Sequence, residues 1–149
     1  MTERQGDGWL QNYIPYLLYR ATNKLNSRLL TRLRQMKINP SQWRVLSVLK
    51  AYGTLSVSEI VEYTLMEQPT VSRVVAQLEQ EGRVIRAASA ADSRVTRVSL
   101  TDAGIEAFNA IIPAALRHQE LALQQLTPEE IKTLTEILSK IERNIELYA

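Results

Sequence analysis

A strand pattern and a helix cap follow one another directly in the segment Asp92-Ser93-Arg94-Val95-Thr96-Arg97-Val98-Ser99-Leu100-Thr101-Asp102-Ala103-Gly104. The first part is rich in β-branched residues in short alternation, which is typical of a strand. The last part contains Thr101-Asp102, a cap sequence that precedes a long apolar-periodic stretch. The segment therefore predicts a strand that leads straight into a helix.

The residues before this segment supply a second strand. Val84-Ile85-Arg86 is another short β-branched run, and the polar residues 89–94 separate it from Val95-Thr96-Arg97-Val98. Two such runs joined by a polar stretch predict a β-hairpin with a flexible tip.

Two short helices with a tight turn between them are predicted just before the hairpin. Ser56-Val57-Ser58-Glu59 has the form of a capping box, and the helix that it starts should continue to about Tyr63. After a break at residues 64–67, a second apolar stripe at helical spacing runs to Glu81-Gly82. This stripe consists of Val71, Val74, Val75 and Leu78. The pattern predicts a helix-turn-helix followed directly by a hairpin, the arrangement called a wing.

Two helices are predicted upstream. The first carries an apolar stripe from Ile14 to Leu33, with Pro15 in its first turn. The second starts at the cap Asn39-Pro40 and stops near Gly53. Its inward-facing residues are expected to be Trp43, Leu46 and Leu49.

Two more helices are predicted after Thr101. The first should carry one stripe and a kink at Pro113, and the second starts at Thr127-Pro128-Glu129-Glu130 and keeps heptad spacing to Tyr148. The expected stripe of the first is Ile105, Phe108, Ile112, Ala115, Gln119, Ala122 and Leu126. Any single stripe could face the chain's own core. However, these two helices and the first helix are together too long and too apolar for a small winged domain to cover. This favours packing against a second copy of the chain.

The composition restricts the possible functions. The net charge is +2, but residues 1–100 carry 14 Lys and Arg against 8 Asp and Glu, so basic character gathers where a polyanion could use it. Without cysteine and with a single histidine, His118, neither a thiol switch nor a cysteine or histidine metal cluster is expected. The chain has no phosphate loop and no catalytic motif, so it is not expected to be an enzyme and no cofactor is expected. It contains no apolar run long enough to span a membrane and no signal peptide, which predicts a cytoplasmic protein.

The order of these elements resembles the MarR family of winged helix-turn-helix transcriptional regulators. The segment Asp92–Gly104 matches the wing signature of that family, D-x-R-x(5)-L-T-x-x-G, without a gap. Shorter similarities lie at 39–46, 68–73, 78–82 and 126–130, so that the resemblance spans about residues 10–146. It implies a mainly α fold with a small β-hairpin wing in a single domain, residues 1–149. Dimerisation helices are expected at about 10–36 and 101–148, and the winged helix-turn-helix at about 40–100.

The expected partner is double-stranded operator DNA. With its apolar stripe buried, the recognition helix from about Gln68 to Glu81 leaves polar residues free for the major groove. There Arg73 could read guanine or pair with a phosphate, Gln68 could read adenine, and Thr70 could contact a thymine methyl group or a phosphate. The resemblance places Arg94 in the minor groove and has Asp92 hold the turn by pairing with an arginine. The candidate DNA-binding residues are Ser58, Gln68, Pro69, Thr70, Ser72, Arg73, Gln77, Arg86, Asp92, Arg94 and Arg97.

The resemblance also implies a homodimeric repressor that a small aromatic or anionic ligand releases from DNA. Candidate ligand-binding residues, which could equally serve packing, are Tyr13, Tyr16, Tyr19, Arg20 and Trp43. His118 is interpreted as a polar position on the long helix. Two alternatives remain open: a regulator that binds DNA constitutively without an effector, and a helical dimerisation module that does not bind DNA.

Overall fold

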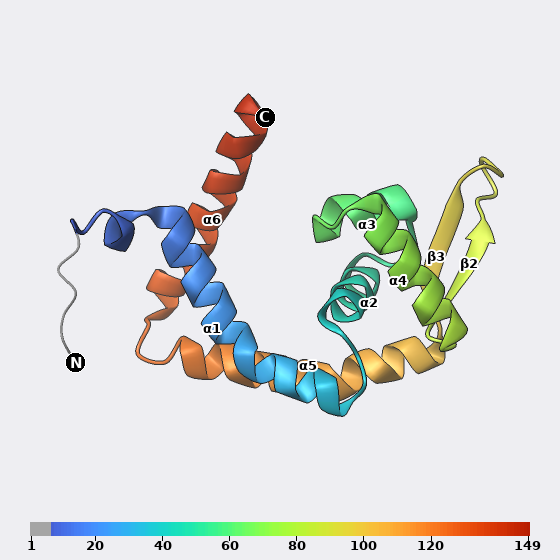
Figure 1. Cartoon of the computed structure of the whole chain (residues 1–149), viewed down its shortest axis with the longest axis horizontal. Coiled ribbons are helices and arrows are strands. Elements are labelled where there is room, and N and C mark those ends of the chain that lie inside the picture. The colour runs from blue at the N-terminus through green and yellow to red at the C-terminus, as the bar shows by residue number, and fades with distance from the viewer. Residues whose placement is uncertain (1–6) are drawn as a thin grey trace.

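The computed structural model describes residues 7–149, which form two parts joined by a long helix (Figure 1). One part is the winged helix-turn-helix, made of α2 (Pro40–Tyr52), β1 (Leu55–Ser56), α3 (Val57–Thr64), α4 (Gln68–Gln80), β2 (Val84–Ala88) and β3 (Thr96–Leu100). The other part comprises η1 (Leu10–Asn12), α1 (Ile14–Gln35), α5 (Asp102–Ala122) and α6 (Pro128–Tyr148). α5 begins directly after β3, continues into the other part and packs along α1, and α6 follows from the far end of α5.

The predicted helix starts are confirmed. Asn39, Ser56 and Thr127 each form a capping box, in which the cap side chain accepts a backbone N–H and the third helical residue reaches back. Thr101 Oγ1 accepts from the backbone N–H of Gly104 at 3.1 Å. Pro15 lies in the first turn of α1, where its missing N–H has no partner to lose.

The sheet has one strand more than the sequence predicted. β2 and β3 form the expected antiparallel hairpin, but β3 is the central strand, because β1 pairs with its other edge through Leu55 opposite Val98. β1 has only two residues, too few to show an alternating pattern. The wing is therefore part of a three-stranded sheet, which ties it to the start of α3.

The core of the winged part contains the apolar stripe predicted for the recognition helix. Its four residues, together with Leu46 and Leu49 of α2, are at most 2% exposed. Trp43, expected to face inward, is only half-buried and stacks on Phe108 of α5 with the ring centroids 5.2 Å apart. This contact joins α2 to α5.

The stripe predicted for α5 is only partly covered by the subunit's own core: Phe108, Ile112 and Ala115 are half-buried. The buried residues of α5 are Gly104 and Ile111, whereas Ile105 is 37% exposed. The helix continues through Pro113 to Ala122, so Leu126 lies beyond its end. Apolar side chains occur on more than one face of α5, and the sequence pattern did not show which face the chain's own core covers.

The α1, α5 and α6 part leaves much apolar surface uncovered. No residue of α6 is buried, and Leu134, Ile137, Leu138 and Ile145 are 39–48% exposed. The chain exposes 11337 Å², whereas a compact monomer of 17.0 kDa exposes about 7,700 Å². Within residues 7–149, no helix combines the length and the hydropathy needed to cross a membrane.

Candidate nucleic-acid interface

A cavity of about 460 Å³ opens where α3 and α4 begin and the wing folds back toward them. Residues from three separate elements line it, and five were predicted from the sequence to contact DNA. These five are Ser58, Gln68, Ser72, Arg86 and Arg94. Two arginines and no carboxylate line this concave surface, so it suits the negative backbone of a nucleic acid.

The exposed faces of α4 present the remaining candidates of this helix. Pro69 and Arg73 are exposed on the outer side, and Arg73 forms no ion pair with another described residue. Thr70 is half-buried. Gln77 does not face the wing: it lies nearer the end of α4 and lines a second cavity beside α1 and α2. The structure thus separates Gln77 from the residues around the first cavity.

The tip of the wing holds Arg94 almost fully in solvent. Asp92 Oδ1 accepts from the backbone N–H of Arg94 at 3.0 Å and from its Nε at 3.3 Å. The side chain of Arg94 is nevertheless 90% exposed. The arginine that the resemblance expected to pair with Asp92 is Arg94 itself, so the carboxylate fixes the turn and orients the guanidinium. A surface pair of this kind stabilises by only about 0–1 kcal/mol, so it can yield to a phosphate.

Arg86 on β2 is attached to the recognition helix through Glu79. Its guanidinium donates to Glu79 Oε1 at 2.8 Å, and its backbone N–H donates to Glu79 Oε2 at 3.2 Å. The hydrogen bond from the Arg86 side chain is the main cause that lowers the pKa of Glu79 below its ordinary value of 4.5, and the same bond raises the pKa of Arg86. Glu79, which sequence reasoning missed, therefore holds the wing against α4.

This pair predicts a measurable titration. In a side-chain carbon NMR titration, the midpoint of Glu79 is expected below 4.5. Because the folded pKa is the lower one, the contribution of the pair to stability is present at neutral pH and is lost as the pH falls through that pKa. Arg86→Gln should return the midpoint toward 4.5, whereas Arg83→Gln, which removes the partner of Glu81, should leave it unchanged. A wild-type midpoint at or above 4.5 would contradict the pairing.

Arg97 on β3 is used within the subunit. Its guanidinium donates to the backbone oxygen of Thr54 at 2.9 Å and lies 3.8 Å from Glu59 Oε2. It thereby ties the central strand to the start of α3, where Ser58 lies. A structural role of this kind leaves Arg97 less free than Arg94 to contact phosphate.

The candidate ligand residues do not come together within the subunit. Tyr13, Tyr16, Tyr19 and Arg20 lie on or just before α1, where Arg20 donates to the Tyr16 hydroxyl at 3.3 Å and lies over its ring at 5.7 Å. Tyr13 and Tyr19 are 49% and 65% exposed. Trp43 instead packs on Phe108, between α2 and α5. None of these five residues lines the three cavities that lie between α1 and α5, between α1 and α4, and between α3, α4 and the wing. His118 is half-buried on α5 and borders a small cavity with Lys24 and Arg28 of α1.

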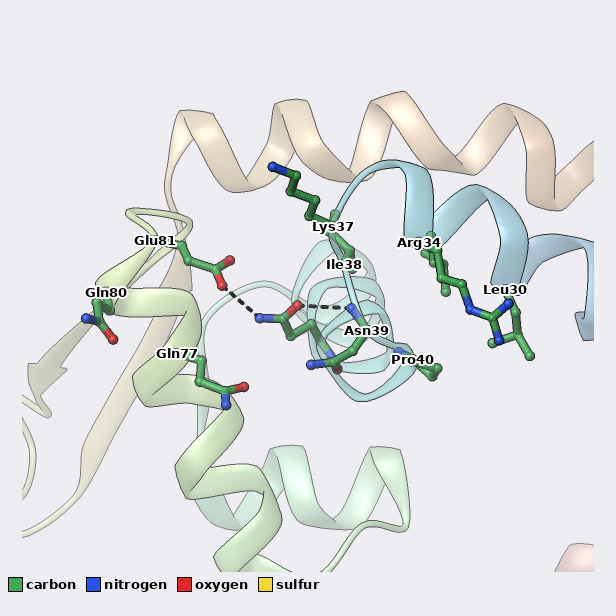
Figure 2. Close-up of a pocket in the computed structure, with 11 residues that line it drawn as sticks. Leu30, Arg34, Lys37, Ile38, Asn39, Pro40, Gln77, Gln80 and Glu81 are labelled. Atoms are coloured by element: carbon green, nitrogen blue, oxygen red, sulfur yellow. Dashed lines mark hydrogen bonds between the residues drawn. The ribbon is translucent and has the colours of Figure 1, made fainter.

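A larger cavity, of about 640 Å³, lies between the end of α1, the start of α2 and the end of α4. Figure 2 shows Gln77, Gln80 and Glu81 on one side and Leu30 and Arg34 on the other. We call it the α1–α4 cavity.

Sequence reasoning missed the polar residue at the centre of this cavity. Gln42 is the one buried polar residue of the described chain, at 4% exposure. It lies three residues after Asn39, a spacing that could have indicated a capping box. Gln42 also donates a hydrogen bond to Glu81, but no sequence pattern could have indicated this bond, because the two residues lie far apart in the sequence.

Comparisons with known proteins agree with the fold. The sequence model of the MarR family matches residues 36–95. A crystal structure of a MarR family transcriptional regulator from Silicibacter pomeroyi is 33% identical, covers 99% of both chains and superposes with a TM-score of 0.86. The transcriptional regulator MhqR of Bacillus subtilis is 29% identical, with 89% of this chain and 91% of MhqR aligned. The transcriptional repressor MdtR of the same organism is also 29% identical, with 92% and 88% aligned.

The fold and the positive cavity between recognition helix and wing define a winged helix-turn-helix protein of the DNA-binding regulator class. The chain belongs to the MarR family of transcriptional regulators. A further similar structure, 26% identical over 87% of this chain and 98% of its own, with a TM-score of 0.70, is BpsR of Bordetella bronchiseptica. The BpsR structure concerns the mechanism by which 6-hydroxynicotinic acid regulates the DNA binding of BpsR.

Proposed function

We propose that the protein is a homodimeric repressor that binds double-stranded operator DNA and that a small organic acid releases it. The observation that carries the DNA-binding part is the cavity where α3, α4 and the wing meet, because it gathers polar and cationic side chains from three elements with no carboxylate. Regulation by an acid is supported by the similarity to BpsR, and repression by the similarity to MdtR.

The candidate residues have distinct proposed roles. The first turns of α4 enter the major groove, where Arg73 reads guanine, Gln68 reads adenine, and Pro69, Thr70 and Ser72 contact the groove wall. Arg94, at the exposed wing tip, enters the neighbouring minor groove and responds to its width. The proposed phosphate contacts are Ser58, Arg86 and Arg97. Gln77 is the weakest candidate, because it faces the α1–α4 cavity.

Dimerisation through α1, α5 and α6 is the second part of the proposal. The exposed surface exceeds that of a compact monomer by roughly 3,600 Å². Interfaces of stable homodimers bury about 2,000–5,000 Å² counted over both subunits, so pairing of two copies can cover a large part of this excess. In a two-fold dimer, the two recognition helices read half-sites about one DNA turn apart. Residues 10–36 and 101–148 form the dimerisation part, and residues 40–100 form the DNA-binding part.

The first test is the selection of DNA fragments from random genomic DNA at increasing salt. Recovery of a palindromic sequence, with affinity that falls steeply with salt, is the expected result. A folded dimer that enriches no sequence, with or without added organic acids, would favour the dimerisation-module alternative. Sequence-specific binding that no acid weakens would favour a regulator without an effector.

Arg73→Ala is expected to weaken binding to the selected operator by roughly 1–3 kcal/mol per contact and to relax the preference at one position of each half-site. The reason is the loss of the bidentate contact between guanidinium and guanine. Fluorescence anisotropy with operators that vary at that position measures both effects. The control variant Arg143→Ala removes the same charge from α6, far from the proposed DNA interface, and should not change the affinity for the operator. If Arg73 contacts only phosphate, all sequences would weaken equally and the salt slope would fall by about one.

A further inference from the structure

The wing is attached to the rest of the subunit on two sides, and the two attachments differ. On one side β1 pairs with the central strand β3, and Arg97 of β3 donates to the backbone oxygen of Thr54 at 2.9 Å. On the other side β2 is the edge strand, and its residues beyond Val84 are exposed. The first attachment leads to the start of α3, whereas β2 lies against α4, the recognition helix.

One acidic side chain makes the attachment between β2 and α4. Within residues 7–149, the hydrogen bonds that join these two elements both run from Arg86 to Glu79. The guanidinium donates at 2.8 Å and the backbone N–H at 3.2 Å. The backbone N–H belongs to an edge strand and would otherwise be left to water. The carboxylate therefore fixes the main chain of the wing, which a pair between two side chains alone would not do.

The recognition helix and the tip of the wing face the same cavity. Gln68 and Ser72 of α4 line it together with Arg94 of the wing. In the proposed function, α4 reads bases in the major groove and Arg94 enters the neighbouring minor groove. A change of one base pair between these two contact regions moves them about 3.4 Å along the DNA axis and about 35° around it. A wing held rigidly against α4 can therefore satisfy both contacts at one separation only.

From these contacts we propose that Glu79 is a positioning residue that fixes the spacing between the bases read by α4 and the A·T-rich minor groove entered by Arg94. It acts through Arg86, because the bound β2 keeps the hairpin, and hence its tip, in one position relative to α4. The preferred operator then carries an A·T-rich flank at a fixed distance from the bases that α4 reads. This consequence rests on the proposed function, whereas the attachment of the wing to α4 does not.

The first test measures the attachment without DNA, by NMR-detected hydrogen exchange of the full-length protein. Glu79→Ala should speed the exchange of the Arg86 backbone N–H by about tenfold, because the variant leaves this edge-strand group to water. The control Glu62→Ala removes the same charge from an exposed position of α3 that forms no ion pair with another described residue. It should leave the exchange unchanged. Equal exchange of the Arg86 N–H in Glu79→Ala and the wild type would overturn the proposal.

The second test measures the spacing preference by fluorescence anisotropy. The DNA duplexes carry the selected half-site with the A·T-rich flank at the selected distance, or with one base pair inserted or removed between the two. The wild type and Glu62→Ala should prefer the selected distance by about tenfold, the scale of one lost specific contact. In Glu79→Ala the preference should fall to about twofold or less. Each preference is a ratio of two affinities measured on one preparation, so an inactive fraction of the protein cancels.

Glu79→Gln separates positioning from charge. It removes the same negative charge as Glu79→Ala but keeps an oxygen that can accept from the Arg86 N–H, so it should retain more of the spacing preference. The proposal is overturned if the two variants behave alike, if Glu79→Ala keeps the full preference, or if the wild type accepts all spacings equally. A protein that selects no DNA, but in which Glu79→Ala speeds the exchange at Arg86, would contradict the proposed function and leave the attachment intact.

Discussion

Gly104→Ala is expected to destabilise the protein by about 1–3 kcal/mol, the usual cost of forcing a methyl group into filled space. A Cβ at this position would overlap the backbone oxygen of Arg83, and the carbonyl carbon of Arg83 and a Leu100 methyl group would each be 3.1 Å away. The overlapping atom belongs to the backbone, so no change of rotamer can relieve the clash.

The carbonyl of Arg83 cannot move freely, because it has a partner. It accepts from the backbone N–H of Thr101 at 3.0 Å, next to the bond of 2.6 Å that Thr101 Oγ1 donates to Gly82. These bonds fix the start of α5 against the segment that joins α4 to β2. A shift there would carry the wing away from the recognition helix, so DNA affinity should fall together with stability.

Urea unfolding followed by circular dichroism measures the loss of stability. Glu106→Ala, at an exposed position of the same helix, is the control and should stay within about 0.5 kcal/mol of the wild type. If Gly104→Ala unfolds at the same urea concentration as the wild type, the close approach of α5 to Arg83 does not exist in solution.

Leu134→Glu combined with Leu138→Glu is expected to convert the dimer to a monomer and to abolish operator binding at protein concentrations that saturate the wild type. These leucines are 40% and 39% exposed in the subunit. Burying a fully exposed leucine contributes about 1.5–3 kcal/mol, so covering the remaining two-fifths of four leucines contributes roughly 2–5 kcal/mol to a two-fold dimer. The dimer dissociation constant should therefore rise by about 10²-fold or more, because four carboxylates would also be placed in the interface.

Sedimentation equilibrium measures the dissociation constant, and circular dichroism checks that the winged part stays folded. The winged part should stay folded in this variant, because no residue of α6 is buried within the subunit. Lys132→Glu with Lys140→Glu on the polar side of α6 changes the net charge twice as much and should leave the dimer intact. A dimer that survives the leucine substitutions would place the subunit interface elsewhere.

The positions where helices begin could be predicted because the responsible contacts are local. Each capping box joins residues three apart, so the cap and its partner are visible in one short stretch of sequence. The buried stripe of α4 follows from helical periodicity in the same way. These local rules placed the helix-turn-helix and the wing, and hence Arg73 among the candidate DNA contacts, whereas Arg94 was assigned its role by the family resemblance.

The arrangement of the candidate site required the tertiary structure. Contacts that define it join residues far apart in sequence: Gln42 with Glu81, Arg97 with Thr54, and the pairing of Leu55 with Val98. No periodicity encodes such pairs. The side of α5 that is buried, the attachment of Arg86 to Glu79 and the separation of Gln77 from the cavity between α3, α4 and the wing were all unforeseen for this reason.

The sequence by itself thus determined the helices, their caps, the wing strands and the family that they resemble. Those features depend on hydrogen bonds and periodicity within one or two helical turns. The tertiary structure alone decided which side chains share a cavity and which apolar faces remain exposed. Both depend on how the helices cross, and crossing is set by the packing of many distant side chains at once.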